Sequence, residues 1–317
     1  MWMHGFVSLF LPSSWRGAAY LRRAKKLLVP EIERRRRAMV GADPKTNDNL
    51  LSWMLEIATP AESSPRDLAH LQVVMALASI HTSQMNAVHV LYDLAARPEY
   101  LSELRGEIAE LVRDDGPWRA WQKPSFAKLR KLDSFIRESQ RLNPPSLLSC
   151  HRVMLTDHVC ADGGVLPRDA HVCLPASAIQ NSPDTTPDPD VFDGLRYYKM
   201  RQRPGEAHLH QFVSTQTNVL NFGHGRYACP GRFFAALEIK NLLVRLIMDY
   251  DWRLPDGQGR PANLTAHEFV FPNPDAVIHV KKRPRELRLD YLGLEVGAEK
   301  QTPAGAGGQE VAGVEAQ

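Results

Sequence analysis

Apolar residues continue without a helix breaker from residue 65 to residue 96, in the stretch PRDLAHLQVVMALASIHTSQMNAVHVLYDLAA. A serine-rich segment with Pro65 near the first helical position precedes this stretch, and Pro98 follows it. The apolar residues occupy most of the helical circumference, which is typical of a helix inside a domain. The pattern therefore predicts one long central helix.

Shorter helices and a few strands are predicted after it. Apolar residues recur at three- and four-residue intervals in residues 98–114, 126–142 and 230–250, which predicts three more helices. Short strands are predicted at residues 150–155, 171–175 and 276–280. The fold class expected from this pattern is mainly α with a small β region.

The two ends of the chain differ from its centre. Residues 15–40 are basic with a helical pattern, either a solvated helix face or a surface for acidic partners or anionic lipid. The apolar run before Pro12 is shorter than the about 20 residues that a bilayer span needs, and it lacks the flanks of a secretory signal. Residues 297–317 are small, polar and glycine-rich, which predicts a disordered tail.

Composition narrows the function classes. With 317 residues and 44% hydrophobic content, the chain can bury a sizeable core. A net charge of +3, from 39 Lys and Arg against 36 Asp and Glu, is far from the basic excess of nucleic-acid-binding proteins, so no nucleic-acid partner is expected. The four cysteines are irregularly spaced, unlike a disulfide framework, and a reducing compartment is expected.

One cysteine has the surroundings of an anionic ligand. Cys229 lies in NFGHGRYACPGRFFA, and Pro230 suits the first turn of the helix that follows, whose dipole favours a thiolate. Gly223 and Gly225 permit a tight turn, and Gly231 leaves room for a large flat partner. Two arginines of the stretch, Arg226 and Arg232, add positive charge. A buried structural cysteine needs none of these neighbours.

This stretch resembles the haem-binding loop of the cytochrome P450 monooxygenases. Phe222, Gly225, Cys229 and Gly231 occupy the four defining positions of the family's loop pattern. The resemblance implies haem b as cofactor, with Cys229 as the axial ligand of the iron. It also implies the cytochrome P450 fold.

Other motifs of the family are present. Glu138 and Arg141 in ESQR match its ExxR pair, and Arg196 stands where a further arginine completes a buried structural cluster. In ASIHTS, Thr82 matches the hydroxyl that holds water for proton delivery, while Ser79 replaces the usual glycine and His81 the usual acid. Alone, this hexapeptide would be read as a packed helix with back-bonded hydroxyls.

Three more positions are similar to haem contacts of the family. Arg152 and His224 resemble residues that meet the haem propionates. Tyr227 stands where the family often has Arg or His, and its phenol still donates one hydrogen bond without the charge.

The resemblance implies a function and partners. Residues 1–296 are expected to be the C-terminal portion of a cytochrome P450 domain that lacks the N-terminal part. Such an enzyme takes electrons from NADPH-cytochrome P450 reductase and inserts one oxygen atom of O2 into an apolar small molecule, here in the style of filamentous-fungal secondary metabolism. The family is anchored in the endoplasmic-reticulum membrane and faces the cytosol. Without an anchor, this chain is expected to be cytosolic or peripheral to the membrane.

Two alternatives stay open at this point. A catalytically silent haem-binding remnant of the family would share every motif. A zinc site would use the cysteines and histidines of the β region, Cys150, His151, His158, Cys160 and Cys173, but their spacing fits no paired-ligand pattern. These residues also lie on strand-like segments whose side chains alternate in direction.

Overall fold

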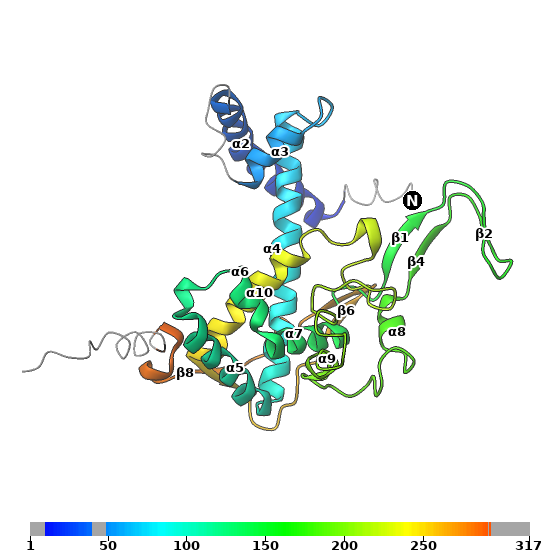
Figure 1. Ribbon diagram of the computed structural model, residues 1–317. Coiled ribbons are helices and arrows are strands. Elements are labelled where there is room, and N and C mark those ends of the chain that lie inside the picture. The colour runs from blue at the N-terminus through cyan, green and yellow to red at the C-terminus, as the bar shows by residue number, and fades with distance from the viewer. Residues whose placement is uncertain (1–9, 40–48, 291, 293–317) are drawn as a thin grey trace, which may run out of the picture. The chain divides into compact units, whose positions relative to one another are not determined.

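The computed structural model describes residues 10–39, 49–290 and 292. Its contacts group into two compact units, Met1–Thr82 and Ser83–Gln317. The boundary falls inside helix α4 (Pro65–Ala96), whose bounds confirm the predicted long helix (Figure 1). The single domain predicted over residues 1–296 stays a prediction, and the predicted tail lies outside the described residues.

The first unit holds α2 (Pro12–Met39), α3 (Leu50–Ile57) and the first part of α4. Its small core consists of Ile32, Leu68 and Ala69. The pattern predicted α2 but not α3, an eight-residue helix that begins where the Asn49 side chain accepts a hydrogen bond from the Ser52 backbone N–H. None of the helices in the described part of the chain is long and apolar enough to span a membrane.

The second unit is mainly helical. Its helices are α5 (Glu99–Asp115), α6 (Lys123–Lys128), α7 (Arg130–Leu142), α8 (Ala176–Gln180), α9 (Arg196–Met200) and α10 (Arg232–Asp249). Its described residues also form the 3-10 turns η2 (Trp118–Ala120), η3 (Gly225–Tyr227) and η4 (Arg285–Leu287). The expected fold class, mainly α with a small β region, is confirmed.

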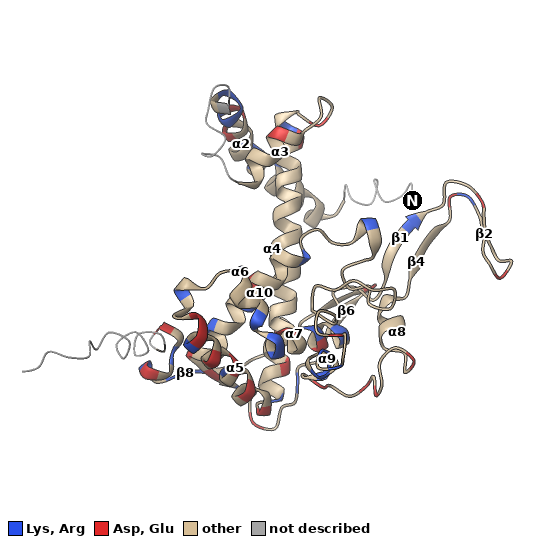
Figure 2. Cartoon of the chain, viewed as in Figure 1, with Lys and Arg blue, Asp and Glu red and all other residues tan. Residues whose placement is uncertain are grey.

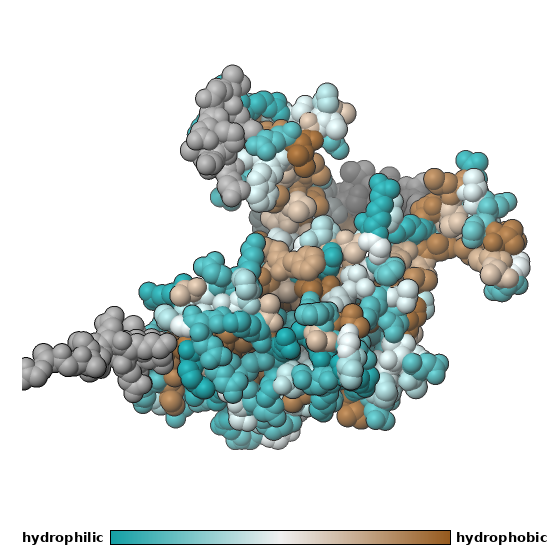
Figure 3. All heavy atoms as spheres, in the orientation of Figure 1, coloured by the Kyte–Doolittle hydropathy of each residue, from teal (hydrophilic) through white to brown (hydrophobic). Residues whose placement is uncertain are grey.

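The β region consists of antiparallel strand pairs. The strands are β1 (Ser149–Val153), β2 (His158–Val159), β3 (Val165–Leu166), β4 (His171–Leu174), β5 (Tyr250–Arg253), β6 (Leu264–Ala266), β7 (Phe269–Phe271) and β8 (His279–Lys282). They pair as β1 with β4, β2 with β3, β5 with β8 and β6 with β7. Exposed apolar side chains such as Val153, Leu155 and Val159 give the first two pairs the brown surface in Figure 3.

The boundaries differ from the predictions in three places. The helix predicted over residues 126–142 is broken at Leu129, whose side chain is fully buried, into α6 and α7. Helix α10 begins at Arg232, so Pro230 precedes the first turn and does not lie in it. The last strand begins at His279, because only residues 279–282 pair with β5.

The core of the second unit forms where α5, α7 and α10 pack together. Helix α5 contributes an apolar stripe at helical spacing, Leu101, Leu104, Ile108 and Leu111, and all four side chains are buried. Helix α10 buries Ile239, Leu243 and Ile247 in the same way. These two helices behave as the periodicity predicts.

Helix α7 does not, because residues 132–141 are all buried although most of them are polar. Each polar side chain therefore needs a partner inside the protein. Ser139 donates to Asp93 over 2.6 Å, and Ser134 accepts from the Tyr198 backbone N–H at 3.0 Å. The partners come from α4 and α9, so the polar positions of α7 attach those elements to the core.

Gly194 lies in the tightest position beside this core. A Cβ atom at residue 194 would come within 2.5 Å of Phe135 and 3.0 Å of Tyr100. Phe135 packs edge-on against Tyr100 and Phe192, with ring centroids 5.3 and 5.1 Å apart. The aromatic rings thus occupy the space in front of Gly194.

We expect Gly194→Ala to lower the free energy of unfolding by about 1–3 kcal/mol, because buried aromatic rings cannot move aside without strain. Gly106→Ala is the matched control: it lies inside α5, and its added methyl group meets nothing within 4 Å. That change should stabilise the chain by about 0.5–1 kcal/mol through helix propensity. Urea unfolding of both variants measures the difference, and equal effects would show that the rings do not resist the methyl group.

Candidate functional site

The site is built on the loop between Asn221 and α10. Gly223 and Gly225 have φ angles of +70° and +62°, a conformation that favours glycine. The backbone N–H of Cys229 donates to the carbonyl of Phe222 over 2.7 Å and closes the loop. Cys229 is half-buried, just before the N-terminus of α10.

Arg232, the first residue of α10, lies against the cysteine backbone. Its Nη1 donates to the carbonyl of Cys229 over 2.7 Å, and its guanidinium carbon lies 4.4 Å from the centre of the Phe233 ring. Its Nε is buried and has no hydrogen-bond partner among the described residues. Arg232 therefore places a positive charge beside the backbone of Cys229, at the N-terminus of α10.

Arg152 joins β1 to the cysteine loop. Its guanidinium carbon lies 4.5 Å from the centre of the Tyr227 ring, and the Tyr227 side chain is 69% exposed. His224 is also exposed, at the start of η3. Phe222 points the other way and packs edge-on against the buried Phe212, with ring centroids 5.2 Å apart. Arg152, His224 and Tyr227 are thus accessible to a ligand, while Phe222 anchors the loop.

Glu138, Arg141 and Arg196 form the cluster that the sequence predicted. Glu138 and Arg141 are fully buried and make two parallel bonds of 2.7 and 2.9 Å. Arg196 Nε lies 3.2 and 3.3 Å from the two oxygens of Glu138. One carboxylate therefore compensates two guanidinium groups.

The remaining donors of the cluster hold the chain between α8 and α9. Arg141 donates to the carbonyl oxygens of Pro189 and Val191, over 2.6 and 3.2 Å, and Arg196 donates to those of Pro187 and Val191, over 2.6 and 2.8 Å. Burial alone would lower the pKa of Arg141, but its hydrogen bonds and charge interaction with Glu138 outweigh burial and raise it. Arg141 therefore stays charged.

A chain of side-chain amides, which the sequence analysis missed, links α4 to the cysteine loop. Gln140 Nε2 donates to Asn86 Oδ1 over 3.1 Å, and Asn221 Nδ2 donates to Gln140 Oε1 over 3.3 Å. Ser149 adds a bond of 3.1 Å from β1 to the Leu220 carbonyl. Gln140 lies inside the ESQR motif. The position of a glutamine in that motif is the sequence feature that could have indicated these amide hydrogen bonds.

Comparison with known proteins decides the family. The family model for Cytochrome P450 matches residues 1–280. The chain belongs to the cytochrome P450 family. It is 45% identical to a cytochrome P450 monooxygenase of Emericella nidulans over 285 residues, and 42% identical to one of Penicillium canescens over 283 residues. Each alignment covers 89% of this chain and 53% of the relative, so the chain spans about half the length of these relatives.

The cysteine loop fits the cofactor of this family. Cytochromes P450 bind haem through a cysteine thiolate, which favours cleavage of the O–O bond. Cys229 is accessible, and apart from the two chain neighbours of Gly231 the only described side chain near this glycine is that of Cys229 itself, whose sulfur would lie in ordinary contact, 3.9 Å, with a Cβ at residue 231. Arg232, which donates to the Cys229 carbonyl, adds a positive charge beside the cysteine backbone. These residues suit an anionic sulfur ligand.

The family motif ASIHTS of α4, with Ser79, His81 and Thr82, lies at the end of the first unit, whereas Cys229 belongs to the second. Thr82 Oγ1 donates to the Ala78 carbonyl over 2.6 Å, and Ser79 donates to the Ala76 carbonyl over 3.3 Å. Thr82 and His81 are both exposed. Both hydroxyls are thus back-bonded to the helix, and the proton relay proposed for Thr82 and His81 stays a prediction.

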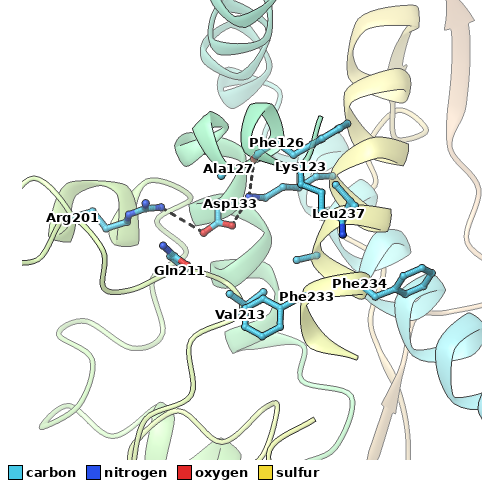
Figure 4. A pocket seen from close by; sticks show the side chains of 12 residues that line it. Lys123, Phe126, Ala127, Asp133, Arg201, Gln211, Val213, Phe233, Phe234 and Leu237 are labelled. Carbon is cyan, nitrogen blue, oxygen red and sulfur yellow. Dashed lines mark hydrogen bonds and ion pairs between the residues drawn. The ribbon is translucent and has the colours of Figure 1, made fainter. Parts of the chain in front are cut away.

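A cavity of about 400 Å³ lies between α6, α7 and the first turns of α10 (Figure 4). Phe233 and Phe234 line it and are both exposed. At its polar end Asp133 accepts from Lys240 Nζ at 2.6 Å and from the Phe212 backbone N–H at 2.9 Å. Arg201 lies 3.8 Å from the same carboxylate. The buried charges therefore compensate one another and hold α7 to α10.

The cysteines and histidines considered for zinc are dispersed over the β1–β4 and β2–β3 pairs. Among the described residues, no three His, Cys, Asp or Glu side chains lie close enough together to hold a metal ion. His151 instead stacks on His171 with ring centroids 5.2 Å apart, and its Nε2 lies 3.3 Å from Glu268. These imidazoles have protein partners of their own.

Proposed function

We propose that this chain forms the haem-thiolate part of a monooxygenase that inserts one oxygen atom of O2 into an apolar small molecule. The observation that carries the proposal is the cysteine loop: a glycine-shaped turn, closed between Cys229 and Phe222, that presents a half-buried sulfur before α10. Membership of the cytochrome P450 family and relatives named as fungal monooxygenases support it. A role in secondary metabolism belongs to the same proposal.

Each site residue then has a role. Cys229 would hold the iron, Gly225 supplies the turn, Gly231 keeps a side chain away from the sulfur, and Phe222 anchors the loop on Phe212. Arg152, His224 and Tyr227 are the exposed cationic and hydrogen-bonding groups for the haem propionates. The contact between Arg152 and Tyr227 would hold both side chains ready for an anionic group.

The cluster and α4 complete the assignment. The cluster of Glu138, Arg141 and Arg196 attaches the segment between α8 and α9 to α7. Gln140, also on α7, accepts a hydrogen bond from Asn221 and so connects this helix to the start of the cysteine loop. Thr82 would hold a water molecule with its hydroxyl, and His81 would relay a proton toward it. We propose NADPH-cytochrome P450 reductase as the electron donor.

Electron delivery tests this proposal without knowledge of the substrate. The 317-residue chain, loaded with haem and held under carbon monoxide, should develop the absorbance band of thiolate-ligated haem when NADPH and a fungal cytochrome P450 reductase are added. Chemical reduction with dithionite is the control for haem binding itself. In air, the same mixture should consume O2 only when both NADPH and the reductase are present.

The alternative is a catalytically silent haem-binding remnant, and the same experiment separates it. A remnant would give the thiolate band with dithionite, but neither the band nor O2 consumption above the reductase background with NADPH. That outcome would overturn the monooxygenase proposal and keep the haem site. No band under either reductant would overturn both.

A further inference from the structure

A second cavity, of about 440 Å³, lies in the second unit away from the cysteine loop. Side chains of α7, the end of α8, α9 and the segment 210–219 line it, and no residue between 221 and 232 does. Figure 2 shows basic positions, in blue, on α7 and α9, the two helices that border it. Most of the lining residues are polar or charged, and two threonines, Thr185 and Thr186, are among them.

Arg137 brings a buried positive charge to this cavity. Arg137 is only 2% exposed, and its Nη1 donates to the Gln211 carbonyl over 2.8 Å. The guanidinium carbon lies 4.1 Å from the centre of the Tyr197 ring. Nε is buried without a partner, and in the part of the chain that the structure describes no carboxylate oxygen lies within 4 Å of this guanidinium.

Such a charge is unusual, because a buried cation is normally paired. Burial lowers the pKa of Arg137, and the nearby Tyr197 opposes that effect. The bond to Gln211 uses Nη1, and Nε, on the other edge of the guanidinium that Nη2 completes, has no partner among the described residues. This is the edge with which arginine binds carboxylate and phosphate groups through two parallel hydrogen bonds.

Gln180 lines the same cavity and is also unsatisfied. It is 1% exposed, and neither Oε1 nor Nε2 has a hydrogen-bond partner among the described residues. Its backbone carbonyl, by contrast, accepts from the Thr186 hydroxyl at 2.8 Å. Two buried side chains with unused donors therefore face one polar cavity, which points to an occupant that accepts hydrogen bonds.

The charges around the cavity favour an anion. Four cationic side chains line it, against two carboxylates. Arg196 is taken by Glu138, and Lys199 pairs with Asp193 over 2.8 Å. Two cations, Arg137 and the exposed Arg203, and one carboxylate, Asp184, remain. None of the three has an ion partner within 4 Å in the described chain. The local balance is positive.

We propose that this cavity binds a small oxyanion, a phosphate or carboxylate group, which accepts hydrogen bonds from the Nε edge of Arg137 and from the amide of Gln180. The exposed Arg203 would attract the anion at the surface, and the Thr185 hydroxyl would add a donor. The site is separate from the cysteine loop, so it can be tested without haem and whatever the outcome for the monooxygenase.

Thermal unfolding of the 317-residue chain tests the proposal. Inorganic phosphate and acetate, each at about 10 mM, are compared with chloride at the same ionic strength. Binding of either oxyanion should raise Tm by about 2–4 °C over chloride. Equilibrium dialysis with labelled phosphate gives the affinity. A shift with phosphate alone assigns a phosphate-bearing ligand, and a shift with acetate alone assigns a carboxylate.

Two variants locate the site. Arg137→Gln removes the charge, and Gln180→Leu replaces the unsatisfied amide by an apolar side chain of similar size; each should weaken oxyanion binding about tenfold. Gln180→Leu should not lower Tm in chloride, because it removes two buried unpaired polar atoms. Arg113→Gln, on the exposed face of α5, is the control and should bind as the original chain does.

Two outcomes would overturn the proposal. Equal Tm values in phosphate, acetate and chloride would mean that ordered water satisfies Arg137 and Gln180. Equal oxyanion binding by Arg137→Gln and Arg113→Gln would place any bound oxyanion elsewhere on the basic surface.

Discussion

Cys229→Ala is expected to abolish the carbon monoxide band of thiolate-ligated haem completely. The sulfur of Cys229 is the only group of the loop that can act as an anionic soft ligand, and the glycines around it leave no side chain to replace it. Haem taken up by the variant would be held by a neutral ligand and would absorb at another wavelength. The measurement is the reduced carbon monoxide difference spectrum of the haem-loaded chain.

Cys173→Ala is the matched control for this change. Cys173 is a free, exposed cysteine on β4, so its loss should leave the thiolate band unchanged. Circular dichroism of both variants distinguishes a lost ligand from a lost fold. Persistence of the band in Cys229→Ala would show that another group holds the iron and would remove the basis of the proposed function.

Glu138→Gln is expected to lower the free energy of unfolding by about 3–5 kcal/mol. The substitution keeps the shape of the side chain but removes the carboxylate that pairs with both Arg141, which is fully buried, and Arg196. It also weakens the acceptor for the Asp193 backbone N–H, 3.0 Å from Glu138 Oε1. A buried guanidinium without a counter-charge costs far more than a lost surface pair. Urea unfolding followed by tryptophan fluorescence measures the loss.

Glu103→Gln is the comparison for that experiment. Glu103 also pairs with a cation, Lys131 at 3.2 Å, but its side chain is 47% exposed. Because water screens such pairs, this variant should change the free energy of unfolding by no more than about 0.5 kcal/mol. Similar small effects for both variants would mean that burial does not make the Glu138 cluster important for the fold.

The two experiments separate ligand chemistry from scaffold. Cys229→Ala should remove the haem signature and leave the free energy of unfolding of the haem-free chain nearly unchanged, since the half-buried sulfur has few contacts to lose. Glu138→Gln should weaken the fold, and the haem signature should disappear only as the chain unfolds. The amide chain through Gln140 is the route by which disorder at α7 would reach the loop.

Some predictions from the sequence failed for local reasons. The break at Leu129 is invisible to periodicity, because residues 126–142 keep apolar positions at helical intervals across it. Residues 276–280 have the amino acids that favour a strand, yet β8 begins at His279, where the pairing with β5 begins. Strand position was decided by the partner strand and not by propensity.

The sequence by itself determined features that depend on neighbours along the chain. The long helix over residues 65–96 follows from an uninterrupted pattern between two prolines, and the cysteine loop follows from glycines placed beside one cysteine. The ExxR spacing placed Glu138 and Arg141 on one helix face before any fold was known. These features are local, and the structure shows each of them.

Only the tertiary structure decided which polar side chains are buried and what they meet. Periodicity predicts that the polar residues of α7 share a face, but it says nothing of what covers that face. Their partners, Asp93, Lys240 and Arg196, lie 46 residues or more along the chain from the α7 residues that they contact. The orphaned donors of Arg137 and Gln180 become visible in the same way, because burial belongs to the packed chain and not to the residue.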